Sequence, residues 1–158
     1  IRAEPREVHW RTVLVRTSMP SSALQFDEPA HHAPAPNVPL ANAELAVMEL
    51  LWDHGALSAR QVQDRLYGAS DRSQHGTVQR LLQRLEEKDF VRRARAESVF
   101  KFVPCISRQE YAGAQLETLA GRLTGGSIAP LLSHLIDRKR LSRAELRRLR
   151  QILDGGKP

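Results

Sequence analysis

Between residues 40 and 88 the apolar positions recur with the 3.6-residue period of amphipathic helices. The first predicted helix begins at an N-cap on Asn42 and ends at Gly55, and the second begins at the capping box Ser58–Gln61. A third helix is predicted over about 75–88. Its inward face consists of four apolar residues, Val78, Leu81, Leu82 and Leu85. These patterns predict a compact unit of three short helices.

The period of the apolar positions then changes from 3.6 to 2, which is typical of strands. Residues 90–103 predict a β-hairpin with a polar tip at about 95–98, and Pro104 ends it. Helical patterns return over about 107–124, 127–138 and 142–153. The predicted fold class is therefore mainly α with a small β-hairpin.

The first 39 residues differ from the rest, because they hold six of the nine prolines and none of the nine glycines. Such a stretch buries too little apolar surface to offset the entropy of ordering it. Residues 1–39 are therefore predicted to be a disordered or poorly ordered extension, although the weak alternation over 8–16 is compatible with a strand. Two folded regions are predicted to follow, at 40–104 and 105–154, with 155–158 as a tail.

Charge and composition narrow the classes of partner. The 158 residues include 24 Lys and Arg against 18 Asp and Glu, a net charge of +6, which favours nucleic acid, acidic proteins or anionic membranes. The single cysteine excludes a disulfide framework and any Cys-rich metal site. No apolar run approaches the ~18 residues that a membrane span needs, so we expect no membrane insertion and a cytoplasmic protein.

The order helix, helix, helix, hairpin predicts a winged helix-turn-helix domain, in which the third helix enters the major groove and the hairpin lies along the DNA backbone. Residues 72–101 hold eight basic and four acidic side chains, which supports double-stranded DNA as the partner. The predicted DNA-binding residues lie on the outer face of the third helix and on the hairpin. They are Gly76, Thr77, Gln79, Arg80, Gln83, Arg84, Arg92, Arg93 and Arg95.

The residue types divide the expected contacts. The small Gly76 lets the amino-terminal end of the helix approach a phosphate. Arg80 and the two glutamines match guanine and adenine edges, whereas the other arginines are expected at phosphates. Two alternatives stay open: the polar face is a solvated surface, or the domain is a winged-helix protein-interaction module without specific DNA binding.

The last third of the sequence has more apolar residues than three short helices can bury among themselves. We therefore expect a homodimer through helical residues 105–154, and its two-fold symmetry predicts a palindromic operator. The residues expected to form this dimerisation region are Leu116, Leu119, Leu123, Ile128, Leu131, Leu132, Leu135, Leu149 and Leu153. The basic residues from Arg138 to Arg150 are either a second nucleic-acid patch or a solvated flank of the dimer helices, and the flank is favoured.

Three segments of the unit that we expect to bind DNA, 40–52, 57–59 and 77–88, resemble the penicillinase-repressor family (BlaI/MecI/CopY). Residues 125–132 and 141–146 are similar to its dimerisation region, so the resemblance covers roughly 40–153. It implies a homodimeric repressor that binds an inverted-repeat operator and blocks transcription. In several members a membrane-bound metalloprotease sensor cleaves the repressor, so such a sensor is a candidate partner.

The sequence departs from the family pattern at several places. Asp89 stands where the family usually has Gly, and Gln74-His75-Gly76 replaces the usual Ser cap of the third helix. With one cysteine the chain lacks the paired Cys-x-Cys motifs of the copper-sensing branch. The bond cut in the antibiotic-responsive members is Asn-Phe, and the aligned pair here is Glu117-Thr118.

Other residues that suggest chemistry have simpler interpretations. Adjacent His31 and His32 in a Pro-rich stretch are typical of solvated side chains rather than of a metal site. Cys105, which follows a proline at the start of a helix, is expected to be a packing residue. No phosphate-binding Gly loop or Ser/His/Asp arrangement is present. We therefore expect no catalytic residue, no metal and no cofactor.

Overall fold

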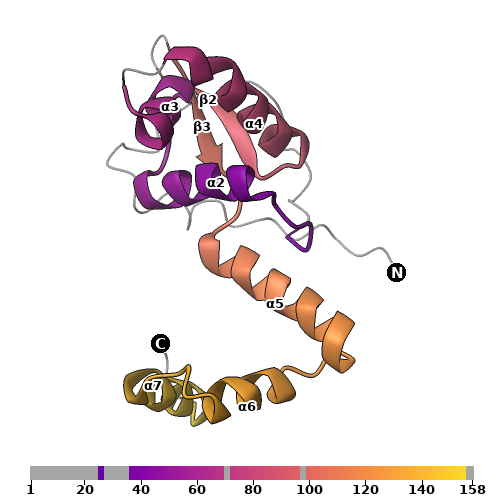
Figure 1. Ribbon diagram of the computed structural model, residues 1–158. Helices are drawn as coiled ribbons and strands as arrows, with labels where there is room; N and C mark the ends of the chain where they lie inside the picture. The colour runs from indigo at the N-terminus through magenta and orange to yellow at the C-terminus, as the bar shows by residue number, and fades with distance from the viewer. Residues whose placement is uncertain (1–24, 27–35, 70–71, 97–98, 156–158) are drawn as a thin grey trace. The chain divides into compact units, whose positions relative to one another are not determined.

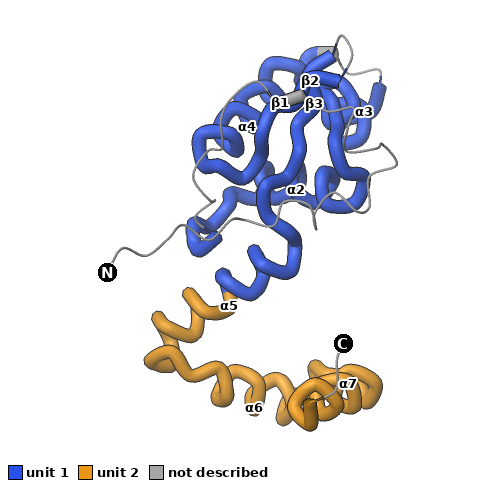
Figure 2. The backbone as a smooth tube through the Cα atoms, turned by 180° about the vertical axis from the view of Figure 1, so that it is seen from behind, with its two compact units in different colours: residues 1–115 blue, residues 116–158 orange. Residues whose placement is uncertain are grey.

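The computed structural model describes residues 25–26, 36–69, 72–96 and 99–155. The weakly alternating segment 8–16, in which a strand was considered, and the histidine pair of the extension lie outside the described residues. The chain divides into two compact units, residues 1–115 and 116–158 (Figure 2).

The first unit contains the predicted helix, helix, helix, hairpin order. Helices α2 (Asn42–His54), α3 (Ala59–Tyr67) and α4 (His75–Glu87) surround the strands β2 (Val91–Ala96) and β3 (Val99–Pro104), and a 3₁₀ turn over Arg72–Gln74 leads into α4 (Figure 1). One core joins all five elements, and its largest fully buried side chains are Phe90, Met48, Leu51, Leu82 and Leu85. The predicted fold class, mainly α with a small hairpin in a winged helix-turn-helix order, is confirmed.

Helix α2 begins differently from the prediction. Its N-cap is Ala41, and Asn42 is the first helical residue, so the cap assigned to Asn42 was wrong. The Glu44 carboxylate instead accepts a hydrogen bond from the backbone N–H of Ala41 at 2.9 Å. The backbone group is thus satisfied from inside the helix, as Glu does at the third position of a capping box.

The capping box at Ser58 forms as predicted. The Ser58 hydroxyl accepts from the Gln61 N–H at 3.2 Å, and the Gln61 side-chain oxygen accepts from the Ser58 N–H at 2.9 Å. The same reciprocal pair joins Ser142 to Glu145 at the start of α7 (Arg143–Leu153). These helix starts are local events, which explains why the sequence pattern locates them.

The hairpin is antiparallel, with Arg92 opposite Val103 and Ala96 opposite Val99. Arg95 and Ala96, which were predicted to be part of the polar tip, continue strand β2. The carbonyl and N–H of Leu57, between α2 and α3, pair with Phe102 at 2.8 and 3.2 Å. This bridge attaches β3 to the helical layer, so the wing is anchored at its base.

A short strand outside the predicted domain joins the sheet. Strand β1 (Gln25–Phe26) pairs with β2, placing Gln25 opposite Arg95 and giving the strand order β1-β2-β3. The expectation that residues 1–39 lack regular structure does not hold at these two residues. The physical reason is that an edge strand presents unpaired backbone N–H and C=O groups, which a neighbouring segment can satisfy.

The first unit continues beyond the expected boundary at 104/105 into α5 (Arg108–Thr124). Tyr111 on α5 is buried, and its ring lies 5.7 Å from that of Phe90 and 5.9 Å from that of Trp52. Its hydroxyl accepts a hydrogen bond from the Leu40 N–H at 3.0 Å. These contacts join the first turns of α5 to the core of the first unit.

The second unit contains the rest of α5, together with α6 (Ala129–Asp137) and α7. No side chain of α6 or α7 is buried within this unit. Across the described ranges, no helix combines the length and the apolar content required to cross a membrane.

Candidate nucleic-acid interface

Helix α4 has two distinct faces. Val78, Leu81, Leu82 and Leu85 are buried, as predicted. The residues expected to face DNA are all exposed, and they are Gly76, Thr77, Gln79, Arg80, Gln83 and Arg84. The apolar face that holds the helix in the core therefore leaves a continuous polar face outside, which is what groove recognition requires.

The amino-terminal end of α4 has no side-chain cap. Its N-cap residue Gln74 makes no side-chain capping hydrogen bond. A Cβ added at Gly76 would meet no described atom within 4 Å, so packing within the protein does not require glycine there. Backbone N–H groups at a helix start favour an anionic group, and the space beside Gly76 allows close approach.

His75, the first residue of α4, contacts the core. It was not predicted from the sequence to be a functional residue. Its Nδ1 lies 3.0 Å from Oε1 of Gln63, a buried residue of α3, and its Nε2 lies 3.4 Å from Nε2 of Gln79. The available signal was the i, i+4 spacing of His75 and Gln79 on one helix face. The contact with Gln63 depends on how α3 packs against α4, which no local pattern contains.

The wing arginines differ from one another in environment. Arg93 donates to Glu86 on α4 at 2.8 Å, and its guanidinium lies 5.5 Å from the centre of the Phe102 ring. Arg92 is half-buried, whereas Arg95 is exposed. Arg93 is exposed too, but it is paired with the end of α4, whereas Arg95 is an exposed cation of β2.

Lys88 was counted among the basic side chains of the interface, but it forms an ion pair with Glu44. The Lys88 ammonium lies 2.8 Å from Oε2 and 2.9 Å from Oε1 of this carboxylate. Burial opposes the ionisation of Glu44. Its hydrogen bonds with Lys88 and the Ala41 N–H, with the charges of Lys88 and Arg84, nevertheless hold the pKa of the carboxyl below its usual value. Lys88 therefore joins the end of α4 to the start of α2.

Groups that might suggest other chemistry do not form a reactive site. Burial raises the pKa of the Cys105 thiol to about 12, so this thiol is protonated at neutral pH, whereas a nucleophilic cysteine reacts as the thiolate. Within the described part of the chain, no three His, Cys, Asp or Glu side chains gather as metal ligands would. The polar face of α4 and the wing is the arrangement with a clear chemical use, the recognition of a polyanion.

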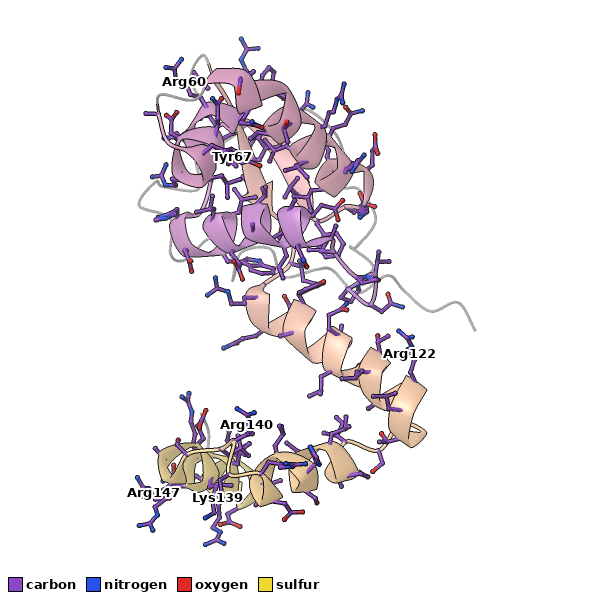
Figure 3. The ribbon with its side chains drawn as sticks, in the orientation of Figure 1. Arg60, Tyr67, Arg122, Lys139, Arg140 and Arg147 are labelled. Carbon is purple, nitrogen blue, oxygen red and sulfur yellow. The ribbon has the colours of Figure 1, made fainter. Side chains whose placement is uncertain are left out.

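The second unit exposes both apolar and basic side chains. Of the residues expected at a dimer contact, Leu123 is 66% and Leu153 is 84% exposed. Four more are also exposed, and they are Leu116, Leu119, Leu132 and Leu135. The remaining three, Ile128, Leu131 and Leu149, are half-buried. Ile136 and Ile152 are exposed as well, and the sequence analysis missed them. Basic side chains of this unit, including Arg122, Lys139, Arg140 and Arg147, are also exposed (Figure 3).

Comparison with known proteins agrees with this geometry. The penicillinase repressor family matches residues 40–155, which covers α2 through α7. The chain belongs to this family. The family consists of winged-helix, DNA-binding transcriptional repressors rather than enzymes.

Several characterised members are similar over most of their length. The chain is 27% identical over 115 residues to a penicillinase repressor of Bacillus licheniformis, which covers 73% of this chain and 89% of that protein. It is 32% identical over 120 residues to the transcriptional regulator BlaI of Mycobacterium tuberculosis, covering 74% and 86%. Among solved structures, a MarR family protein from Bacillus stearothermophilus superimposes with a TM-score of 0.40 at 21% identity, covering 75% of this chain and 78% of that one.

Proposed function

We propose that this family member is a dimeric, sequence-specific repressor that binds an inverted-repeat operator and blocks transcription. The observation that carries the proposal is the division of α4, with every apolar side chain buried and the glutamines and arginines outside. A winged helix that recruits a protein would carry an apolar patch on that face. The alternative of a protein-interaction module is therefore not supported by α4.

The contacts proposed for DNA follow from the side-chain environments. Arg80, Gln79 and Gln83 are proposed to reach base edges, because Arg suits guanine and Gln suits adenine in the major groove. Gly76, Thr77 and Arg84 are proposed to lie at phosphates beside the helix. Arg95 is proposed to be the main phosphate contact of the wing, because Arg92 is half-buried and Arg93 is paired with Glu86.

The dimer is proposed to form through the exposed apolar residues of the second unit. An apolar surface of this extent is typical of an interface rather than of a solvated monomer. If both copies use the same surface, the contact is two-fold symmetric, and the two α4 helices read an inverted repeat. Light scattering of the protein at micromolar concentration should give the mass of a dimer.

Substitutions on this surface test the dimer. The double variant Leu123→Glu, Leu153→Glu should be a monomer, because it places two charges in an apolar contact. Ala144→Glu, at an exposed position of α7, is the matched control and should remain dimeric. A dimer that persists in the double variant would contradict the proposed interface.

The operator is tested on DNA directly. In a gel shift, the protein should bind the DNA upstream of its own gene in preference to random DNA of the same length. Arg80→Ala should reduce this preference by about 1–3 kcal/mol, the usual value of one base contact. Equal binding to both DNAs by the unaltered protein would refute sequence-specific recognition.

We also propose a membrane-bound metalloprotease sensor as a partner. It would cleave this repressor, which would then release the DNA. The aligned bond, Glu117–Thr118, lies inside α5, with Glu117 exposed and Thr118 half-buried. A sensor that cuts there would need a specificity other than Asn-Phe. Mass spectrometry of the chain recovered from induced cells should then show the new ends at this bond.

A further inference from the structure

We infer that His75 is the residue that positions Gln79 for reading an adenine, by linking it to the buried Gln63. The inference rests on the proposed function, because it concerns how α4 would read DNA. It assigns a role to two residues outside the predicted contact set. The starting point is the chain Gln63, His75, Gln79, with separations of 3.0 Å and 3.4 Å between the paired atoms.

The hydrogen-bonding chemistry selects one form of His75. The Gln63 oxygen can only accept, so the 3.0 Å contact requires a proton on Nδ1 of His75. The Gln79 atom facing His75 is its amide nitrogen, which can only donate, so Nε2 of His75 must carry a lone pair. Both contacts are satisfied together by the neutral imidazole with its proton on Nδ1.

The hydrogen-bonding groups of Gln79 that remain after its contact with His75 match one base. Its amide nitrogen has two N–H bonds, and one of them is directed to His75. The second N–H and the side-chain oxygen remain, one donor and one acceptor. This is the pair that adenine takes in the major groove, where N7 accepts and the N6 amino group donates. The contact with His75 therefore orients the amide without using the atoms that read the base.

The anchor of this arrangement is in the core. Gln63 is 4% exposed on α3, so its side chain is held by packing, whereas Gln79 is exposed on the outer face of α4. A long exposed side chain loses rotamer freedom when it binds a base, and fixing it beforehand reduces that loss. Gln83, the other glutamine on the same face, donates to Glu87 at 3.0 Å and has no such link to the core. This difference makes Gln83 the natural control.

The first experiment uses the free protein and needs no DNA. Nitrogen NMR of the neutral His75 ring should show its proton on Nδ1. In His75→Asn the Gln79 side-chain amide signals should shift, while those of Gln83 should not. A proton on Nε2, or Gln79 signals unchanged in the variant, would overturn the inference.

The second experiment selects binding sites from a random DNA library. The unaltered protein should enrich a motif, and Gln79→Ala should lose an adenine preference at one base pair by about tenfold. His75→Asn retains a donor toward Gln63 but cannot reach Gln79. It should reduce the adenine preference at the same base pair by about threefold or more. Gln83→Ala should reduce the preference at a different base pair and leave the adenine preference unchanged.

The outcomes separate this inference from the function on which it rests. If the unaltered protein enriches no motif, sequence-specific binding is refuted, and the adenine role of Gln79 fails with it. If a motif is enriched and Gln79→Ala relaxes an adenine but His75→Asn leaves it unchanged, only the positioning role of His75 is refuted. If His75→Asn relaxes every base pair equally, its effect is a general loss of α4 structure, which also refutes the positioning role.

Discussion

At the scale of single residues, the ion pair between Glu44 and Lys88 is the clearest case in which position decides chemistry. Lys88 is one of the eight basic side chains of residues 72–101 that support DNA as the partner. The two side chains meet at 2.8 Å, with Glu44 only 3% exposed. A carboxylate at such a position is tolerated because a cation and a backbone N–H both satisfy it.

Removing the cation should therefore lower stability. In Lys88→Met the Glu44 carboxylate keeps only its contact with the Ala41 N–H, and we expect a loss of about 2 kcal/mol in the free energy of unfolding. Arg60→Met, at an exposed position of α3, is the control and should change stability by less than about 0.5 kcal/mol. Urea denaturation measures both. Equal stability of the two variants would mean that the ion pair contributes nothing.

The same carboxyl predicts a dependence on acid. Its pKa is lowered in the folded state, so the stability it contributes is present above the pKa of an unfolded Glu, about 4.3, and is lost as the pH falls through the folded value. Glu44→Gln should be less stable than the unaltered protein at pH 7, and the gap should narrow at pH 3. Denaturation curves at both pH values test this. A gap of constant size would contradict the assignment.

At the scale of elements, the turn between α4 and β2 depends on the backbone conformation of a single residue. This residue ends α4 and leads the chain into the first strand of the wing. Asp89 has φ 60°, and the Phe90 N–H donates to the Leu85 carbonyl at 2.9 Å, so the helix ends in a Schellman-type cap. Gly is the residue that adopts this left-handed conformation most readily. Asp is among the few other residues that adopt it, at some loss of stability.

Substitution at the turn should follow the preference for positive φ. Asp89→Gly should be about 0.5–1 kcal/mol more stable than the unaltered protein, and Asp89→Ala about 1 kcal/mol less stable. Thermal denaturation should therefore order the three proteins as Gly, then Asp, then Ala. An Ala variant more stable than the Gly variant would show that φ at residue 89 does not limit stability.

The wing should contribute affinity rather than sequence preference. Arg95→Ala should weaken binding to all DNA sequences alike and reduce the slope of log affinity against log salt by about one. Arg93→Ala should in addition lower thermal stability, because it loses the Glu86 pair and the packing over Phe102. Binding titrations at several salt concentrations, with melting curves, distinguish the two. A loss of base preference in Arg95→Ala would contradict this role.

At the scale of the whole molecule, charge and apolar surface are distributed unevenly between the units. Residues 105–158 hold ten basic and five acidic side chains, and α6 and α7 bury none of their side chains within their own unit. The second unit is therefore suited to covering its apolar residues with another copy. Its positive charge would add long-range attraction to DNA that weakens as salt rises.

The amino-terminal extension should be dispensable for operator binding. Residues 1–39 carry four basic and four acidic side chains, so their removal changes no net attraction to phosphate. Deletion does remove β1 and the contact between the Gln115 amide and the Pro36 carbonyl at 2.9 Å. A protein that begins at Val38 should bind the operator within about tenfold of the full chain, or 1.4 kcal/mol. A larger loss would give the extension a direct role in binding.

The features that the sequence determined by itself are those that arise within a few neighbouring residues. The periodic apolar face of α4 and the capping boxes at Ser58 and Ser142 follow from short-range geometry, so their residues and their structure agree. The order of these elements was enough to predict the winged helix-turn-helix fold and the outward face of α4.

Tertiary structure decided everything that joins residues distant in the chain. The sequence contains no local signal that Lys88 pairs with Glu44, that Gln63 reaches His75, or that β1 adds to β2. Each contact depends on how two packed elements align their side chains or backbone groups. Helix periodicity predicts the face on which a charged residue lies, but not whether that residue pairs with another element. The exposed face of α4 could therefore be predicted from the sequence. Which of the side chains near α4 pair with other parts of the protein, and which stay accessible, could be seen only in the folded chain.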